Sequence, residues 1–294
     1  MYYLPIEYHQ PLFRPPSEGN SLILQVTLVC SNNECAFCEM YKTKKFTVRK
    51  REKVQEEILN IKQLGIPVQK IFLADGDAFV LSKKRLLEIC TDINDSFPNL
   101  KRISAYALPS NINSKSIEDL VELRKAGIKL LYIGIESGDN EVLESVSKGE
   151  TYASTKEALL KLKKAGIKAS VMVLIGLGGK QLSKQHAIES AKLVNETQPE
   201  FVSTLVLSFP YGVEKFKQEF RGEYEEMNQK ELLEELRLFI QNLELQNSTF
   251  RSNHASNYLV LKGQLNQDKD NFLALIDKAL EGKVYLRPEW VRGL

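Results

Sequence analysis

Hydrophobic and polar positions alternate in two different ways along the first two thirds of the chain. Short apolar, β-branched runs typical of buried strands occur at residues 22–28, 70–73, 102–106, 129–135, 168–174 and 201–207. Between these runs, apolar residues recur at three- and four-residue spacing, as in Leu120, Leu123 and Ala126, which predicts amphipathic helices. The helices are expected at residues 48–64, 83–97, 116–126, 153–165 and 184–197. Six strands that alternate with helices predict an α/β fold with a parallel sheet and right-handed crossovers.

The pattern changes near residue 208. Residues 1–20, rich in proline, polar and aromatic side chains, are expected to form an N-terminal arm, and residues 21–208 form the core. From residue 209 on we expect a loop, a strong helix near residues 229–243, a polar stretch and further short helices. Because no linker-like segment precedes them, residues 209–294 are predicted to be a C-terminal extension packed on the core, and a candidate lid over the substrate.

The composition excludes several classes of protein. With 294 residues, 43% of them hydrophobic, the chain can bury one substantial core. Its 40 Lys and Arg residues nearly balance 38 Asp and Glu residues, so the net charge of +2 gives no reason to expect nucleic acid or an anionic membrane as a partner. No apolar run approaches the roughly 18 residues that span a bilayer, and the first residues lack the layout of a secretory signal. We therefore expect a cytoplasmic protein.

Three of the four cysteines lie within nine residues, directly after the first predicted strand. Cys30, Cys35 and Cys38 have the spacing C-x4-C-x2-C. A disulfide framework would spread its cysteines over a small secreted chain, so this tight triplet indicates a metal site. Three thiolates on one loop can hold three irons of a cubane cluster and leave the fourth iron open to a substrate or cofactor.

A structural zinc ion is the alternative to this cluster. Zinc normally needs a fourth Cys or His ligand; the nearest His outside the triplet is His9, and the fourth cysteine, Cys90, lies in the middle of a predicted helix. Cys90 belongs to an apolar stripe at helical spacing with Leu86, Leu87 and Ile93, which favours a small buried core residue. The triplet alone therefore favours the cluster and leaves zinc open.

The segment VTLVCSNNECAFCEMY, residues 26–41, followed by alternating strands and helices, resembles the radical S-adenosylmethionine (SAM) superfamily. It is most similar to the branch that shares its core with the Elongator catalytic subunit and oxygen-independent coproporphyrinogen III oxidase, over roughly residues 20–210. The resemblance implies a partial (β/α)6 TIM-like barrel with parallel strands and a C-terminal helical extension. It also implies a 4Fe-4S cluster on Cys30, Cys35 and Cys38 with SAM as the second cofactor. The triplet has one residue more than the usual C-x3-C-x2-C.

The resemblance also assigns SAM contacts near the cysteines. Phe37 matches the aromatic position beside the adenine, and Met40 and Tyr41 lie on the segment that lends backbone contacts to it. At the end of the second strand, Gly76 and Asp77 stand where the family has a Gly-Gly-Glu-like turn that receives the SAM amino group. An ordinary Asp-Gly turn is the alternative reading of this sequence.

Further SAM contacts are implied at the ends of later strands. Glu136 is expected to hold the ribose hydroxyls, and Lys148 resembles the basic residue that pairs with the SAM carboxylate. Leu174 and Gly176 match an apolar stretch that packs against adenine. Tyr106 stands where some relatives have a carboxylate, so contacts there are expected to differ. A solvated lysine and a plain buried strand remain the alternatives at residues 148 and 174–176.

The polar segment of residues 250–258 contains the candidate substrate residues. Its hydrogen-bonding side chains include Arg251, His254 and Tyr258, which we expect to hold the substrate or to move a proton near the radical. An irregular capping loop is the alternative for this segment. His186, beside Lys184 and Gln185 in a predicted helix, is expected at the surface.

The resemblance implies a radical SAM oxidoreductase or transferase. Its reduced cluster would cleave SAM to a 5′-deoxyadenosyl radical, which would take a hydrogen atom from a small-molecule substrate that the sequence does not identify. The partners expected are that substrate and an electron donor such as ferredoxin or flavodoxin. The alternatives are a coproporphyrinogen-oxidase-like activity and a non-catalytic protein that binds zinc or an iron–sulfur cluster.

Overall fold

The computed structural model describes residues 5–42, 44–209 and 212–292. Its main sheet has the strand order β1-β4-β5-β6-β7-β8-β9-β10. The neighbouring strands are parallel from β1 to β6 and from β7 to β9, and β10 is antiparallel to β9. The prediction of an α/β fold with a largely parallel sheet is therefore confirmed. The strands of this sheet are β1 (Leu22–Gln25), β4 (Lys70–Ala74), β5 (Arg102–Tyr106), β6 (Ile128–Glu136), β7 (Lys168–Ile175), β8 (Phe201–Val206), β9 (Thr249–Arg251) and β10 (Lys262–Gln264).

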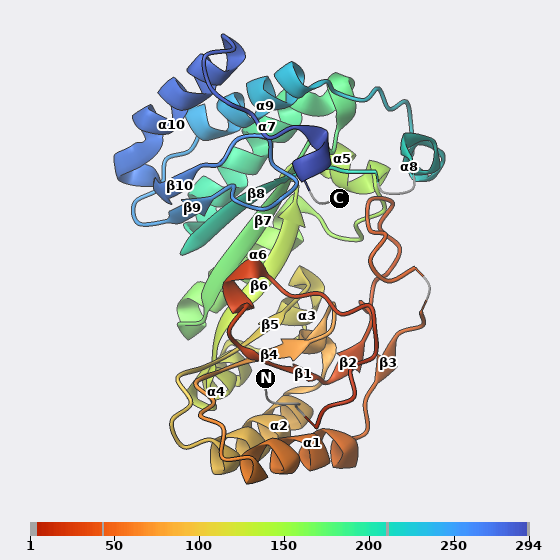
Figure 1. The fold of residues 1–294 in the computed structure, drawn as a ribbon, viewed down its shortest axis with the longest axis vertical. Coiled ribbons are helices and arrows are strands. Elements are labelled where there is room, and N and C mark those ends of the chain that lie inside the picture. The colour runs from red at the N-terminus through yellow and green to blue at the C-terminus, as the bar shows by residue number, and fades with distance from the viewer. Residues whose placement is uncertain (1–4, 43, 210–211, 293–294) are drawn as a thin grey trace. The chain divides into compact units, whose positions relative to one another are not determined.

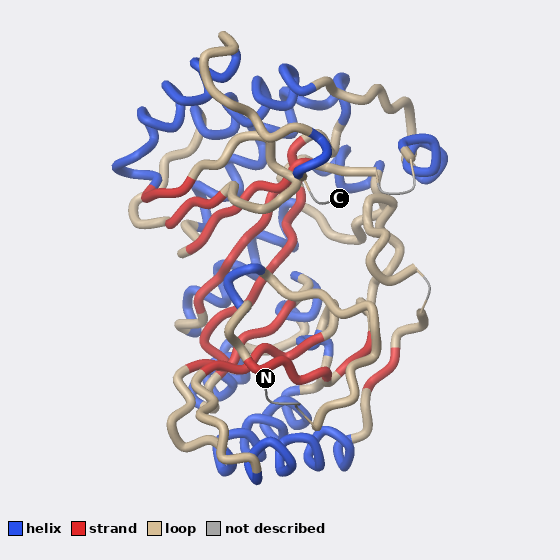
Figure 2. Tube along the Cα trace, in the orientation of Figure 1, coloured by secondary structure: helices blue, strands red, loops and turns tan. Residues whose placement is uncertain are grey.

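The chain divides into two compact units, and the first comprises residues 1–33, 40–133 and 160–169. It contains the strands from β1 to most of β6 and the small antiparallel pair β2 (Thr27–Leu28) and β3 (Thr47–Val48). Its helices α1 and α2 pack side by side (Figures 1 and 2). The helices of this unit are α1 (Arg51–Gln63), α2 (Lys83–Ser96), α3 (Pro109–Asn113) and α4 (Ile117–Lys125).

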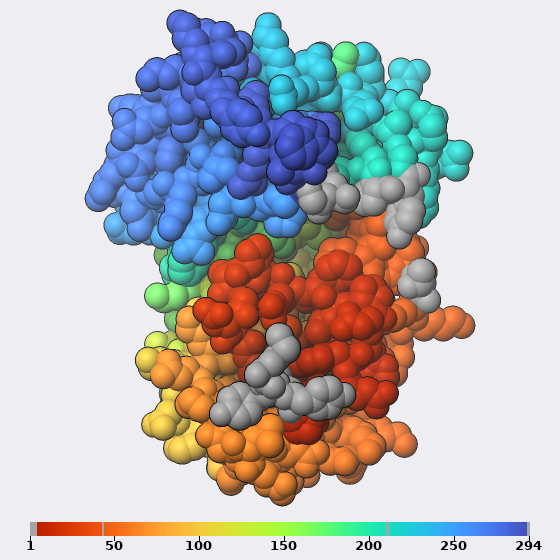
Figure 3. Space-filling model, viewed as in Figure 1, coloured from red at the N-terminus to blue at the C-terminus, as the bar shows by residue number. Residues whose placement is uncertain are grey.

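The N-terminal segment spreads over one face of the first unit (Figure 3). It is anchored there by Glu18, whose fully buried carboxylate accepts hydrogen bonds from Arg102 (2.5 Å), Ser104 (3.0 Å) and Tyr132 (2.6 Å). A buried carboxylate is tolerated only when its oxygens are satisfied in this way. The segment is therefore attached to β5 and β6 by a specific polar contact.

The second unit comprises residues 34–39, 134–159 and 170–294. Its strands β7 to β10 are accompanied by helices of which α7, α9 and α10 pack side by side (Figure 1). Helix α9 begins with a capping box formed by Asn228 and Glu231 and buries Leu232, Leu236 and Phe239 on one face. The helices are α5 (Asn140–Ser145), α6 (Tyr152–Ala165), α7 (Gly179–Thr197), α8 (Val213–Glu219), α9 (Gln229–Gln241) and α10 (Leu265–Leu280).

The C-terminal region differs from its expected secondary structure in two respects. Residues 249–251 form strand β9, which pairs with β8 and extends the sheet, and α10 is a 16-residue helix where short helices were predicted. A three-residue strand is too short to show a periodic pattern, and its pairing with β8 determines its conformation. Helix α7 begins at Gly179, five residues earlier than predicted. No helix in the described part of the chain is long and apolar enough to cross a membrane.

Candidate functional site

In the first unit, the turn after β4 approaches the loop that carries Cys30 very closely. A Cβ atom at Gly76 would lie 2.6 Å from a ring carbon of Tyr41 and 3.0 Å from Cβ of Cys30. Real Cβ atoms do not make contacts this short, so only glycine fits here without displacing its neighbours. Gly76 thus brings the turn of residues 75–77 against the cysteine loop.

Asp77 has a buried carboxylate, and its Oδ1 forms no hydrogen bond within the described part of the chain. Its Oδ2 accepts hydrogen bonds from the Ser31 hydroxyl (2.5 Å) and from the Asn111 amide (2.5 Å). Burial raises the pKa of Asp77 to about 6, against the opposing effect of Ser31, the nearby backbone N–H of Leu108, Lys115 and Asn111. Ser31, which binds the other oxygen of this carboxylate, directly follows Cys30. Oδ1 is therefore suited to bind an ammonium group near the cysteine loop.

Tyr41 and Asp75 hold the same turn from its other side. The Tyr41 hydroxyl donates to Oδ1 of Asp75 at 2.6 Å, and both residues are buried. Burial raises the pKa of Asp75. Met40, the preceding residue, is half-buried, and its role stays a prediction. The structural role of Asp75 escaped the sequence reasoning because any Asp-Gly pair suggests a turn.

Tyr106 lies at the carboxyl end of β5 in a group of aromatic rings. Its ring packs edge-on against Phe72, at 5.1 Å between centroids, and lies 6.1 Å from the ring of Tyr132. Such edge-to-face pairs contribute about 0.5–1.5 kcal/mol beyond the burial of surface. The position thus supplies an aromatic face where some relatives have a carboxylate.

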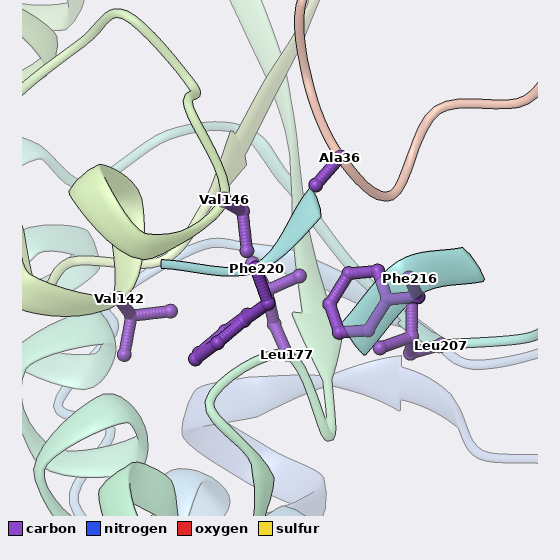
Figure 4. Packing of buried hydrophobic residues seen from close by; sticks show 7 residues of the cluster. All are labelled: Ala36, Val142, Val146, Leu177, Leu207, Phe216 and Phe220. Atoms are coloured by element: carbon purple, nitrogen blue, oxygen red, sulfur yellow. The ribbon is translucent and has the colours of Figure 1, made fainter. Parts of the chain in front are cut away.

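In the second unit, residues 34–39 carry Cys35 and Cys38 and sit on an apolar cluster (Figure 4). The cluster buries Ala36 with side chains from α5, α8 and the ends of β7 and β8, and Phe37 and Leu174 pack against it; its buried members are Ala36, Val142, Val146, Leu177, Leu207, Phe216 and Phe220. The backbone N–H of Ala36 donates to the carbonyl of Val146 at 3.0 Å. Apolar packing therefore positions these two cysteines.

Glu136 and Lys148 form an ion pair next to Phe37. Lys148 Nζ lies 3.2 Å from Oε1 of Glu136, with side chains 5% and 13% exposed, and it lies 5.7 Å from the centre of the Phe37 ring. Glu136 has a φ of 59°, a left-handed conformation that costs a residue other than glycine about 1–3 kcal/mol. The structure thus brings together three residues that the sequence assigned separately.

Gly134 makes this arrangement of Glu136 sterically possible. A Cβ atom at residue 134 would lie 1.9 Å from Oε1 of Glu136. The Glu136 side chain therefore folds back over a position that must lack a side chain. Sequence reasoning missed Gly134, although a glycine inside a predicted strand is a recognised sign of close approach.

Gly176 lies at the end of β7 in a left-handed conformation, with a φ of 88°. Its N–H donates to Oε1 of Glu235 at 2.7 Å, and its carbonyl accepts from the Tyr224 hydroxyl at 3.0 Å. A Cβ atom there would lie 2.7 Å from a methyl carbon of Leu232. Residues 224–235 of the C-terminal extension therefore determine the position of this turn.

His186 is fully buried, which corrects the expectation that it lies at the surface. Its Nδ1 is 2.7 Å from the Ser137 hydroxyl, and its Nε2 is 3.5 Å from Oε1 of Glu235. The polar neighbours Lys184 and Gln185 suggested exposure, but residues 186, 187, 190, 191 and 194 form the buried face of α7 at helical spacing. That periodicity was the signal available in the sequence.

The candidate substrate residues make contacts within the second unit. His254 Nδ1 is 2.9 Å from the Ser256 hydroxyl, and burial, together with Arg287, lowers the pKa of His254. The Tyr258 hydroxyl donates to Glu289, and burial raises the pKa of Tyr258 to about 12. Both groups are therefore neutral near pH 7.

Arg251 lies on β9 beside Ser203 of β8. Its guanidinium is 5.9 Å from the centre of the Phe201 ring, and its Nε is buried without a hydrogen-bond acceptor among the described residues. The guanidinium thus retains a donor for a group from outside the chain.

Three cysteine thiolates supply the donor chemistry of an iron–sulfur cluster. Cys90 is fully buried and burial raises its pKa to about 12, which confirms it as a core residue. Within the described ranges, no three His, Cys, Asp or Glu side chains converge on a point that would hold a single metal ion. A cubane requires no such convergence, because each cysteine binds its own iron. A buried carboxylate oxygen such as Oδ1 of Asp77, without a hydrogen bond among the described residues, has the chemistry to accept an amino group.

Comparison with known proteins identifies the family. The sequence model of the radical SAM superfamily matches residues 24–194. The chain is 22% identical to the uncharacterized protein MJ0486 of Methanocaldococcus jannaschii, over 99% of this chain and 83% of that protein. It is 24% identical to the tRNA uridine(34) acetyltransferase of Methanocaldococcus infernus, over 54% of this chain and 29% of that protein. Coproporphyrinogen III oxidase from Escherichia coli has a similar structure, with a TM-score of 0.58 and 16% identity, over 75% of this chain and 51% of that one.

The fold and the cysteine loop thus define an α/β iron–sulfur protein with a SAM cofactor. The chain belongs to the radical SAM superfamily. Its cofactors are a 4Fe-4S cluster and SAM, and, as a member of this family, it needs a substrate and a reductant. The resemblance to the radical SAM superfamily stated from the sequence is confirmed, and the distant homologues include the tRNA uridine(34) acetyltransferase and, in structure, coproporphyrinogen III oxidase.

Proposed function

We propose that this protein is a radical SAM oxidoreductase or transferase that abstracts a hydrogen atom from a small-molecule substrate. The observation that carries the proposal is the buried Oδ1 of Asp77, which forms no hydrogen bond among the described residues, while Oδ2 accepts from the hydroxyl of Ser31, the residue after Cys30. When bound, the reduced cluster supplies the electron that cleaves SAM to a 5′-deoxyadenosyl radical. The residues of the chain bind SAM, orient it and exclude water.

We assign the cluster ligands and the amino-group contacts as follows. Cys30, Cys35 and Cys38 each bind one iron. Asp77 accepts the amino group of SAM through Oδ1, and Gly76 allows the backbone to approach. Tyr41 holds this turn through Asp75, and Met40 contributes backbone contacts.

The remaining SAM contacts are assigned to the second unit and to the end of β5. Glu136 accepts from the ribose hydroxyls, and Lys148 pairs with the SAM carboxylate. Phe37, Leu174 and Gly176 provide the apolar surface for the adenine. Tyr106 presents an aromatic face in place of a carboxylate. The proximity of Lys148 to both Glu136 and Phe37 supports this assignment.

The substrate contacts are assigned to the extension formed by residues 209–294, which we propose packs on the core of residues 21–208 as a lid. Arg251 donates to an acceptor on the substrate through the part of its guanidinium that lacks a protein partner. Nδ1 of His254 accepts the Ser256 N–H, so neutral His254 offers its Nε2–H to the substrate as a donor. The Tyr258 hydroxyl gives its proton to Glu289, so its oxygen is suited to accept a hydrogen bond.

Anaerobic spectroscopy tests the proposal. The protein is reconstituted with iron and sulfide, reduced with dithionite or with flavodoxin, and studied by electron paramagnetic resonance with and without SAM. A reduced cluster signal that changes on adding SAM, together with release of 5′-deoxyadenosine, supports the proposal. A zinc-loaded protein, or a cluster signal that is insensitive to SAM, contradicts it. The variant Cys35→Ala is the negative control.

A further inference from the structure

A chain of buried polar side chains in the second unit links the turn at Gly176 to the turn after Glu136. His186, Glu235 and Ser137 are 0%, 2% and 0% exposed. They come from α7, α9 and the residue that follows β6. None of them belongs to the SAM contacts assigned above.

One end of this chain holds Gly176. The carboxylate of Glu235 accepts the N–H of Gly176 at 2.7 Å, and its Oε1 is also 3.5 Å from Nε2 of His186. The Tyr224 hydroxyl binds the Gly176 carbonyl at 3.0 Å. Both backbone polar groups of Gly176 are therefore bound by side chains of the C-terminal extension.

The other end holds the residues after Glu136. His186 Nδ1 is 2.7 Å from the Ser137 hydroxyl oxygen, which accepts the N–H of Asp139 at 2.9 Å. Nearby, the Ser190 hydroxyl accepts the N–H of Gly138 at 2.9 Å. A Cβ atom at Gly138 would lie 2.2 Å from the carbonyl oxygen of Glu189, so α7 packs directly against this turn.

Burying this chain of polar side chains lowers the stability of the fold relative to apolar side chains packed at the same positions. Glu235 is buried, which raises its pKa, and the groups that oppose this rise are His186, Ser183 and the Gly176 N–H. Oε2 of Glu235 and Nε2 of His186 form no hydrogen bond within the described part of the chain. Well-packed apolar side chains of similar volume would often be as stable or more stable here. What this pair provides is directional contact with two backbone turns at once.

We propose that His186 and Glu235 are positioning residues that hold the Gly176 turn and the Glu136–Ser137 turn in one fixed relationship, so that the adenine and ribose contacts of SAM are formed before SAM binds. This inference rests on the assignment of Glu136 and Gly176 to SAM in the proposed function. Loosening Glu235 frees both turns, although only the Gly176 turn is in direct contact with it, whereas loosening His186 frees mainly the turn after Glu136.

The test measures backbone opening separately from SAM affinity. Hydrogen exchange is followed by mass spectrometry in purified protein without SAM, for peptides covering residues 135–141 and 172–180, and the SAM dissociation constant is measured on the reconstituted protein. Glu235→Ala is expected to accelerate exchange in both peptides and to raise the dissociation constant about tenfold, as for coupled neighbouring elements. Glu235→Gln keeps an acceptor for Gly176 and is expected to restore much of both properties. His186→Ala is expected to accelerate exchange mainly in residues 135–141.

Glu234→Ala, at the exposed neighbouring position of α9, is the matched control and is expected to match the parent protein in both measurements. Unchanged exchange in the Glu235→Ala protein overturns the inference. If Glu136→Gln weakens SAM binding but Glu235→Ala does not, the inference alone fails. If Glu136→Gln leaves SAM binding unchanged, the proposed SAM contact itself is wrong.

Discussion

The Nζ atom of Lys148 lies 3.2 Å from Oε1 of Glu136, and both side chains are largely withdrawn from water. The two residues are twelve positions apart, yet each satisfies the charge of the other where the family resemblance assigns both to SAM. A partly buried charge must keep a partner, because desolvation is costly. SAM would therefore enter a site whose two charged contacts already fix one another.

Breaking this pair should reduce both stability and SAM affinity. Lys148→Met leaves the Glu136 carboxylate without its cation, and the free energy of unfolding should fall by about 2 kcal/mol, less than for a fully buried pair. The SAM dissociation constant should rise about tenfold. Urea unfolding and calorimetric titration measure the two effects. The double variant Lys148→Met/Glu136→Gln should regain part of the stability, and a double variant no more stable than Lys148→Met would argue against the pair.

Gly134→Ala should displace the Glu136 carboxylate, because the new methyl group would lie 1.9 Å from Oε1. We expect SAM affinity to fall nearly as far as in Glu136→Ala. A double-mutant cycle on the SAM dissociation constant isolates the cause. Once the Glu136 side chain is removed, adding Gly134→Ala should have little further effect; an additive loss would mean that the glycine matters for the strand itself.

The longer elements of the core were predictable because each carries its own periodic pattern, whereas the short β2, β3, α3 and α5 were not predicted as separate elements. Residues 102–106, for example, were predicted as the strand that the structure contains. Strands β9 and β10 were not, because three residues show no period and their conformation depends on pairing, of β9 with β8 and of β10 with β9. The boundaries of such short elements are properties of the sheet as a whole.

Candidate site residues could be predicted from the sequence when their side chains are themselves reactive or charged. Residues that act through packing could not. The cysteine triplet, Asp77 and Glu136 stand at strand ends and are chemically conspicuous. Gly134 acts by leaving room for another side chain. His186 and Glu235 act by binding turns that are distant in the sequence. The residue type alone reveals neither role. His186 was misjudged because its neighbours along the chain are polar, whereas burial depends on the helix face.

SAM affinity should depend on pH through Asp77, whose pKa burial raises from an ordinary value of 3.8 to about 6. The folded protein binds the Asp77 proton more tightly than the unfolded chain does. The free energy of unfolding should therefore decrease as pH rises from about 4 to 6, by a total of about 3 kcal/mol from this group. The amino group of SAM binds the ionised form, so the dissociation constant should fall between pH 5 and pH 7 and level off above. Titrations at five pH values measure this. Asp77→Asn should bind SAM more weakly and without this pH dependence, and an unchanged profile in that variant would assign it to another group.

Alanine variants of the four cysteines should fall into two groups according to their iron content. Cys30→Ala, Cys35→Ala and Cys38→Ala each remove one iron ligand, so iron content after anaerobic reconstitution should fall well below the ~4 irons per chain of an intact cubane. Cys90→Ala is the matched control, since Cys90 is a fully buried thiol in the stripe of α2. It should keep the full iron content and the SAM-sensitive spectrum while losing about 1–3 kcal/mol of stability to the cavity it leaves. Loss of iron in Cys90→Ala alone, with the other three variants fully loaded, would show that the triplet does not bind the cluster.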